Sequence, residues 1–448
     1  MQQQTAYETP YLEAFDAFQG GHASGDPAFI QAHRREAIER FGAQGFPTAR
    51  RGNEAWKYTD VGPLARIPFQ LPDPSRGALV KQGQLKTASF GSGEWPKLVF
   101  VDGTYSEELS NLPRSRNGVT ICNLAEAMTR RPEVVEQHLG RLASQEENGF
   151  TALNAAFVHD GAFVHVSKDY AAEHPVLIIN LSSGKHPDSV SHPRALIVAE
   201  EGAGATVVEM HASLKGSRYF TNAVTEVVVT PGATVRHYRV QRQSPHAYHI
   251  ATIKAEVGRD ATFDSAAVDM GASLARNNLG VTMAGEEGHA ALNGLYLVGD
   301  AQHVDNEVVI DHAAPNTSSR ELYKGILDGK SRSVFHGSII VRKDAQKVNA
   351  SQADKNLLLS EQAEADTKPA FWIYADDVKC GHGAANGQLD ENALFYLQAR
   401  GIDRASARTM LVRAFAREIV QLIDLAPLRD YVDRQVIKVI PQLQSGAA

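Results

Sequence analysis

The feature that most constrains this chain is a repeat of about 28 residues in its middle part. A residue that tolerates the positive φ of a tight corner recurs at this interval six times in succession. The six residues are Gly204, Gly232, Asp260, Gly288, Asn316 and Asp344. Two short runs with alternating apolar residues, typical of half-buried strands, follow most of these corners. Because a unit of two strands cannot bury its apolar face alone, such units are expected to stack on one another.

The repeat therefore predicts a mainly β fold whose core, residues 161–362, is a β-solenoid. A β-sandwich is the competing prediction, although a sandwich does not require a constant repeat length. Helical signals flank the core on both sides. Residues 1–160 are predicted to form a helical or mixed domain, with a helix starting at Asp26 and Pro27. Residues 363–448 are predicted to form a helical domain, with helix caps at Asp390 and Asp403.

The composition excludes several classes of protein. The formal net charge is -7 and the isoelectric point is about 6.2, which argues against nucleic-acid binding because such proteins usually carry a basic face. The first residues lack the pattern of a secretory signal. No apolar run reaches the roughly 18 residues of a membrane span. We therefore expect a cytoplasmic protein with no membrane or nucleic-acid partner.

The inventory of motifs predicts that the chain does not hydrolyse ATP by itself. The chain lacks a Walker A sequence, a G-x-S-x-G nucleophile elbow and an H-E-x-x-H zinc motif. It has two cysteines, Cys122 and Cys380, whereas an iron–sulfur cluster usually takes four protein ligands. We therefore expect no cofactor in the isolated chain.

Two polar segments are candidates for metal binding. In the first, Asp305 and Asp311 lie between His303 and His312, and their even spacing would place both carboxylates on one face of a strand. A solvated solenoid face is the preferred interpretation of this segment, with weak metal binding as the alternative.

The second segment is DDVKCGHGAANGQLDE, residues 376–391, in which Cys380 and His382 stand beside glycines that permit close approach of another surface. A thiolate and an imidazole together suit iron or zinc. From the residues alone, a buried turn cysteine with a satisfied histidine is the preferred interpretation, with a ligand role as the alternative.

Four segments carry a resemblance to a known family: NEAWKYTD at 53–60, HVDNEVVIDHAAPNTSSRELYKGIL at 303–327, VFHGSIIVRKDAQKVNASQADKNLLLS at 334–360 and ADDVKCGHGAANGQLDENALFYLQARGI at 375–402. The chain resembles the SufB/SufD family of iron–sulfur cluster assembly scaffolds, and its SufD branch in particular. The resemblance implies a right-handed parallel β-helix between helical domains. It also implies a non-catalytic scaffold subunit of the SUF system that supports iron acquisition.

The resemblance further implies partners and a site. A SufB-like scaffold would pair with the chain, and a SufC-like ABC ATPase would bind residues 363–448 and supply the ATPase activity. A transient iron–sulfur cluster would assemble at the SufB interface, where the matching positions are His382 and Cys380. Whether the isolated chain forms a homodimer is left open. Two other functions stay open: a purely architectural subunit without metal contact, and a β-helix enzyme acting on polysaccharides with paired carboxylates.

Overall fold

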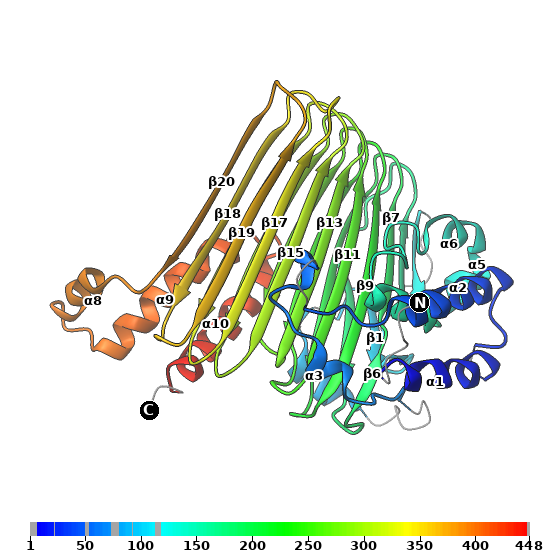
Figure 1. Ribbon diagram of the computed structural model, residues 1–448, viewed down its shortest axis with the longest axis horizontal. Coiled ribbons are helices and arrows are strands. Elements are labelled where there is room, and N and C mark those ends of the chain that lie inside the picture. The colour runs from blue at the N-terminus through cyan, green and yellow to red at the C-terminus, as the bar shows by residue number, and fades with distance from the viewer. Residues whose placement is uncertain are drawn as a thin grey trace.

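The centre of the molecule is a solenoid built from two facing β-sheets (Figure 1). The computed structural model describes residues 7–21, 23–49, 53–72, 80–91, 93–112 and 118–445. The chain alternates between the two sheets, so each strand pairs in parallel with a strand of the next coil. The mainly β prediction with flanking helices is confirmed. The β-sandwich alternative is wrong, because the described ladders are parallel except for β1 with β2 and β3 with β4.

The two sheets are named sheet 1 and sheet 2, and neighbouring strands in the following order are hydrogen-bonded to each other. Sheet 1 contains β2 (Thr104–Tyr105), β1 (Lys97–Val101), β5 (Val176–Ser182), β8 (Gly204–Ser213), β10 (Thr234–Arg242), β12 (Thr262–Asp269), β14 (His289–Val298), β16 (Ser318–Leu327), β18 (Asn349–Leu358) and β20 (Lys379–Gly387). Sheet 2 contains β19 (Glu364–Ile373), β17 (Arg332–Val341), β15 (His303–His312), β13 (Leu274–Met283), β11 (Tyr248–Val257), β9 (Tyr219–Val229), β7 (Arg194–Ala199), β4 (Ala162–Val166) and β3 (Val119–Asn123), with β6 (Ser189–Ser191) paired to β9.

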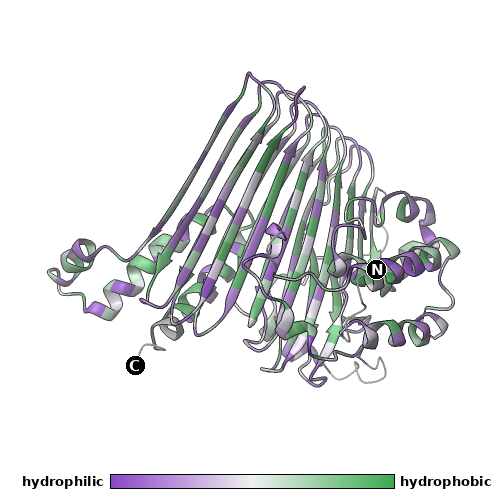
Figure 2. Ribbon diagram, in the orientation of Figure 1, coloured by the Kyte–Doolittle hydropathy of each residue, from purple (hydrophilic) through white to green (hydrophobic). Residues whose placement is uncertain are grey.

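Alternation of apolar and polar residues along the strands builds the interior of the solenoid (Figure 2). Inward-facing residues of successive coils lie directly opposite one another. Ala205, Val235, Phe263 and Ala290 form one such column, and all four are buried. Small and large side chains therefore interdigitate between coils, which gives the stacked units the shared core that the repeat predicted.

The repeat length is an average, not a constant. Paired strands are offset by 26 residues between Tyr248 and Leu274 but by 32 between Arg332 and Glu364. Of the six predicted corners, three have positive φ: Gly232, Asp260 and Asn316. At the other corners a nearby residue takes this conformation: Gly202, Glu287 and Lys347. Loop length varies because only the strand register has to be preserved from coil to coil.

The sheets extend past both limits of the predicted core, residues 161–362. Strands β1, β2 and β3 precede it, and β19 and β20 follow it. The last strand, KCGHGAANG, lacks alternating apolar residues because it lies at the end of the solenoid, where no further coil covers it. Its sequence therefore has the composition of a turn although its backbone is extended.

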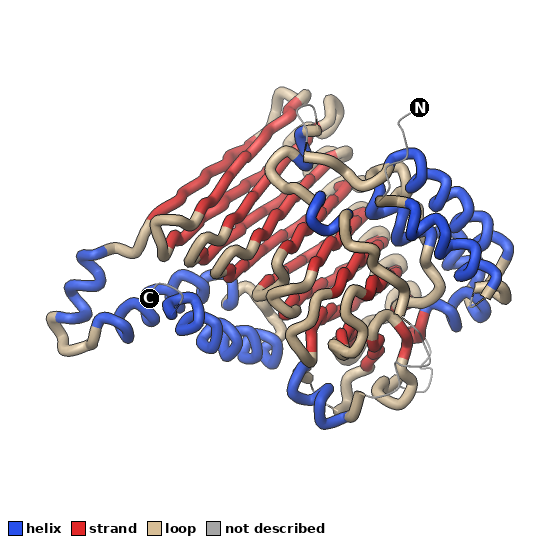
Figure 3. The backbone as a smooth tube through the Cα atoms, turned by 60° about the horizontal axis from the view of Figure 1, so that its bottom comes forward, coloured by secondary structure: helices blue, strands red, loops and turns tan. Residues whose placement is uncertain are grey.

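Helices that precede the core cover one end of the solenoid, apart from those of residues 54–65, which lie on the outer face of sheet 2, and residues 82–88, which pack on sheet 1 (Figures 1 and 3). They are α1 (Thr9–Gly20), α2 (Ala28–Gln44), the 3-10 turn η1 (Glu54–Trp56), α3 (Gly62–Ala65), α4 (Gln82–Ala88), α5 (Leu124–Arg130), α6 (Pro132–His138) and α7 (Gly149–Ala156). Phe41 of α2 and Phe150 of α7 are fully buried and share a cluster with Phe220 of β9. This cluster joins the N-terminal helices to the outer face of sheet 2.

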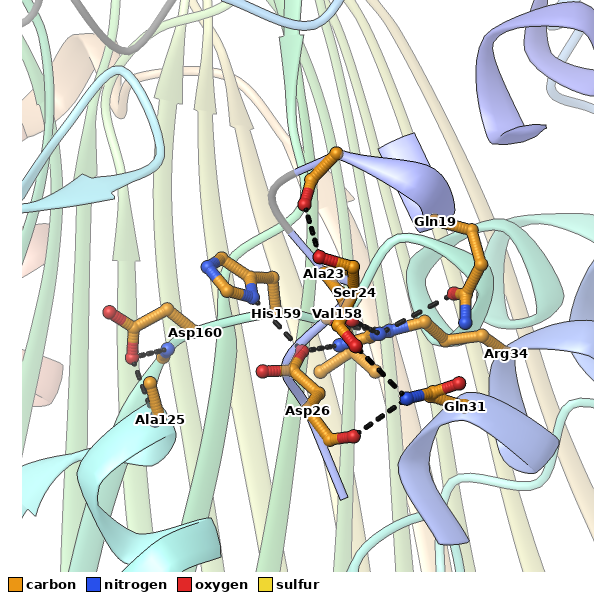
Figure 4. A network of polar contacts seen from close by, with 12 residues as sticks. Gln19, Ala23, Ser24, Asp26, Gln31, Arg34, Ala125, Val158, His159 and Asp160 are labelled. Atoms are coloured by element: carbon orange, nitrogen blue, oxygen red, sulfur yellow. Dashed lines mark hydrogen bonds and ion pairs between the residues drawn. The ribbon is translucent and has the colours of Figure 1, made fainter. Parts of the chain in front are cut away.

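A polar network fixes helix α2 on the solenoid (Figure 4). The sequence predicts Asp26 as a helix cap, but its side chain makes no capping bond to α2. Instead its carboxylate forms an ion pair with the fully buried Arg34, and His159 Nδ1 lies 3.1 Å from the same oxygen. Arg34 Nε also donates to the Val158 carbonyl oxygen at 2.5 Å. A buried charge therefore ties α2 to the chain segment that enters the first full coil.

We expect Asp26→Asn to lower the free energy of unfolding at pH 7 by about 3 kcal/mol, because Arg34 is then buried without a counter-charge. Burial raises the pKa of Asp26, but hydrogen bonds from His159 and Arg34 outweigh burial and leave this pKa below its usual 3.8. A pKa lower in the folded state means that the stabilisation is present above the unfolded pKa and is lost as the pH falls through the folded pKa. The difference in the free energy of unfolding between wild type and variant should therefore shrink below about pH 4, as urea unfolding at several pH values can measure.

Asp16→Asn, at an exposed position of α1, is the control for this experiment. A difference that does not change with pH would contradict this assignment.

Three helices follow the last strand: α8 (Glu391–Gln398), α9 (Arg404–Val420) and α10 (Ala426–Ser445). The predicted caps are confirmed, since Asp390 accepts from the Asn392 amide and Asp403 accepts from the Ser406 amide. Helices α9 and α10 pack on the outer face of sheet 1, whereas α8 projects beyond the solenoid (Figure 1). Among the residues that the structure describes, no helix is long and apolar enough to cross a membrane.

Candidate functional site

The end of the solenoid opposite the N-terminal helices carries two edge strands, β19 and β20, each paired on one side only. They are 10 and 9 residues long, and such edges present unpaired backbone N–H and C=O groups to another chain. On the outward side of β20, a Cβ atom added at Gly381, Gly383 or Gly387 would meet nothing within 4 Å. Close packing inside the described chain therefore does not explain these glycines, which leave a flat backbone surface.

Cys380 and His382 lie on this last strand, not in a turn. Cys380 is opposite Ala350 of β18, and His382 is opposite Gln352. Both partner residues are buried, so the thiol and the imidazole share the inward face of β20, at the mouth of the solenoid. Their Cα atoms are about 7 Å apart along the strand, which lets two donors reach one bound group.

The two side chains differ in environment. Cys380 is half-buried and packs beside Val341 and Ala350, and burial raises the pKa of its thiol. Metal binding at Cys380 would therefore release a proton. His382 is exposed, and its ring centroid lies 4.5 Å from that of Phe371 on β19. The structure thus brings the two predicted site residues together on one face and leaves the imidazole accessible.

Buried polar side chains continue inward from this mouth. Gln352 lies between His382 and Glu321 in the column of inward-facing residues, and its Nε2 donates to Glu321 Oε2 at 2.9 Å. Burial raises the pKa of Glu321 to about 8, so its carboxyl group is protonated at neutral pH. Burial also raises the pKa of Asp354 in the same strand as Gln352, to about 6. Gln352, Glu321 and Asp354 were not among the predicted site residues. Each is a polar residue at an inward-facing position of its strand, and this pattern in the sequence could have identified them.

A second buried polar group lies deeper in the solenoid. Glu209 Oε1 is 2.8 Å from His237 Nε2, and the rings of His211 and His249 are 4.9 Å apart. Burial works against ionisation of Glu209, but the neighbouring imidazoles of His211 and His237 outweigh it and lower its pKa. In the described residues no group of three or more His, Cys, Asp or Glu side chains is arranged to hold a metal ion. These residues form an internal polar layer between coils.

The segment from His303 to His312 does not form one site. His312 faces inward and lies within hydrogen-bond distance of Thr317 and Ser319. Asp311 is paired with Arg342 at 2.6 Å on the surface. Asp305 is 1% exposed, so the interpretation as a solvated face is wrong for this residue. Six residues of extended strand separate the carboxylates by about 20 Å, well beyond the spacing of a glycosidase pair.

Residues 53–60, termed the strap, cover Asp305. Trp56 is buried, and the Arg276 guanidinium lies 4.1 Å from the centroid of its ring. Thr59 Oγ1 donates to Asp305 Oδ2, which also accepts from Arg276. The strap therefore fastens the N-terminal region to the outer face of sheet 2.

Fold and site together define a parallel β-solenoid protein with one helix-covered end and one open end that presents a thiol and an imidazole. The chain belongs to the SufB/SufD family of iron–sulfur cluster assembly proteins of the SUF system. Residues 179–415 match the family "SUF system FeS cluster assembly, SufBD core domain", and residues 5–178 match the "SufBD protein N-terminal region".

Curated relatives agree along most of the chain. It is 30% identical to the iron-sulfur cluster assembly protein SufD of Escherichia coli over 412 residues, which cover 90% of each protein. It is likewise 30% identical to an iron-sulfur cluster assembly SufBD family protein of Synechocystis over 415 residues, covering 91% of this chain and 90% of the relative. The chloroplastic protein ABCI7 of Arabidopsis thaliana is 30% identical over 369 residues, which are 80% of this chain and 72% of that protein.

Proposed function

We propose that the chain is a non-catalytic scaffold subunit that pairs with a SufB-like protein through its open end and binds a SufC-like ABC ATPase through its C-terminal helices. The transient iron–sulfur cluster is cargo that assembles at the SufB-like interface, with His382 and Cys380 as the contacts from this chain. The observation that carries the proposal is the position of both donors on a free edge strand.

Cluster assembly would depend on a complex because this chain offers two donors, Cys380 and His382. A cluster usually takes four protein ligands, so the remaining ligands come from the partner or from solvent species. A neutral imidazole is a known substitute for cysteine in such centres. With iron and sulfide held between two chains, release needs only a change at the interface. In this arrangement the chain contributes to iron acquisition by offering its donors at the mouth of the solenoid.

The open end has the features of a pairing surface. The free edges of β19 and β20 supply backbone donors and acceptors for strand addition. At the end of β19, Trp372 and Tyr374 are 56% and 63% exposed. Exposed aromatics of this kind are typical anchors of protein interfaces. The same surface would serve a second copy of the chain, so a homodimer of the isolated protein stays an open alternative.

The proposed ATPase contact lies on α8 and the start of α9. The apolar side of α9 and α10 is used inside the chain, since Val412 and Ile419 pack against Leu295 and Ile326 of sheet 1. Phe395 on the projecting helix α8 is by contrast 73% exposed. An exposed aromatic on a helix that stands clear of the solenoid can bind a partner without disturbing the fold.

Gly383→Lys tests the open end as the pairing surface. We expect this change to leave the stability of the isolated chain intact, because a Cβ atom added at Gly383 meets nothing within 4 Å and the position is exposed. Binding to a SufB-like partner should weaken by about 30-fold or more, since a charged side chain would be desolvated between the two chains. The control is Gly216→Lys, at an equally open and exposed glycine. Isothermal titration calorimetry can measure the affinity of each variant for the SufB-like partner. Equal affinity of the two variants would place the partner elsewhere.

A further inference from the structure

We propose that the pocket beneath the strap binds a divalent transition-metal cation of the Fe(II) class, with Asp305 and His336 as its protein ligands. This site is separate from Cys380 and His382, and the proposal does not rest on the function proposed above.

The pocket lies between the strap and the outer face of the last three strands of sheet 2, β15, β17 and β19. About 70 Å³ of it is open to water-sized molecules, which is room for several waters or one partly hydrated ion. Glu54 and Tyr58 of the strap form one wall, and Asp305 and His336 belong to the strands that form the other. The strap therefore converts a sheet surface into a small, partly enclosed site.

Asp305 supplies an unused acceptor to this pocket. The side chain is 1% exposed, and its Oδ2 accepts from both Thr59 and Arg276. Its Oδ1 is buried and has no hydrogen-bond partner within the described part of the chain. A buried carboxylate oxygen without a partner is destabilising by about 1–3 kcal/mol or more. A donor or a cation in the pocket would remove this cost.

His336 supplies a second lone pair. It lies opposite Glu307 in the ladder of β15 and β17, so it is a diagonal neighbour of Asp305 on the same face. Its Nε2 lies 3.5 Å from Ser338 Oγ and its Nδ1 lies 3.8 Å from Glu307 Oε1, and both distances are too long for a strong hydrogen bond. Burial and then the charge of Lys368 lower its pKa, which favours the neutral imidazole. A neutral imidazole is the form that ligates a metal.

The charges around the pocket favour a cation over an anion. Lys368, the cation among the lining residues, forms an ion pair with Glu54. Arg276 is paired with both Asp305 and Glu307. These cations are therefore occupied, and the pocket offers lone pairs instead. A carboxylate with an imidazole suits Fe(II) and its neighbours in the transition series. Two protein ligands with water in the other positions imply weak, exchangeable binding.

Iron-directed cleavage of the full-length protein tests the location. Fe(II) is added anaerobically, and ascorbate with hydrogen peroxide then generates hydroxyl radicals at the bound ion. Mass spectrometry should find backbone cuts within residues 54–58, 334–336 and 366–368. Cuts confined to residues 380–382 would overturn this site while supporting the function proposed above. Absence of cuts in all of these segments would also overturn the site.

His336→Gln tests the ligand itself. Calorimetric titration with Co(II) should show binding weakened by at least about tenfold in this variant. The control is His289→Gln, which removes a half-buried imidazole of sheet 1 that contacts Ser318 at 2.9 Å, and it should bind Co(II) like the wild type. Unchanged affinity in His336→Gln would overturn the proposal. The cleavage map of the wild-type protein keeps the test decisive if the variant does not fold.

Discussion

The His382→Ala variant is expected to assemble with its SufB-like and SufC-like partners in normal yield and to carry almost no iron–sulfur cluster. Assembly survives because one exposed imidazole is a small part of a large interface. Cluster content should fall by about tenfold or more, because loss of a ligand leaves this chain with Cys380 alone at the mouth of the solenoid. Iron, sulfide and visible absorbance per purified complex, after anaerobic co-expression, measure the effect.

The matched control for this experiment is His246→Ala, which removes an exposed imidazole from a loop of the solenoid far along the chain from β20. Its complex should carry clusters at the wild-type level. If His382→Ala does so as well, His382 serves only to pack on Phe371. A purely architectural role of the subunit would then be preferred.

The second large effect is expected from Phe395→Asp on helix α8. Aromatic anchors of interfaces cost about 2–4 kcal/mol when lost, so binding of the SufC-like ATPase should weaken by a factor of about 30 to 1,000. The unfolding midpoint of the isolated chain should not change, because Phe395 is 73% exposed. Tyr170→Asp, at a 47% exposed aromatic on the solenoid, should leave ATPase binding intact. Equal binding by both variants would exclude α8 as the contact.

A point substitution is a sharper test of the ATPase contact than deletion of residues 363–448. That deletion would remove β19 and β20 together with the helices. It would also uncover the apolar outer face of sheet 1, on which α9 and α10 pack. Loss of ATPase binding by such a truncated chain would therefore not separate docking from folding.

Much of the architecture could be predicted because it follows from local chemistry. Corner residues at intervals of about 28 residues and apolar alternation between them are sufficient to predict a stacked β-solenoid, even though the length of the individual coils varies. Asp390 and Asp403 behave as caps because a carboxylate at a helix start finds amide donors within its own first turn. Asp26 does not act as a helix cap, because its carboxylate pairs instead with the buried guanidinium of Arg34, eight residues along the chain.

For the candidate sites, the sequence identified the residue types, whereas the tertiary structure decided where these residues lie. The residue types at Cys380 and His382 were sufficient to nominate them as donors, since thiol and imidazole chemistry does not depend on the fold. Their placement on a free edge strand, and the covering of Asp305 by residues 53–60, were decided by the tertiary structure. Neither follows from local sequence. An edge exists only where the stack of coils ends, and the strap meets Asp305 across 246 residues of chain.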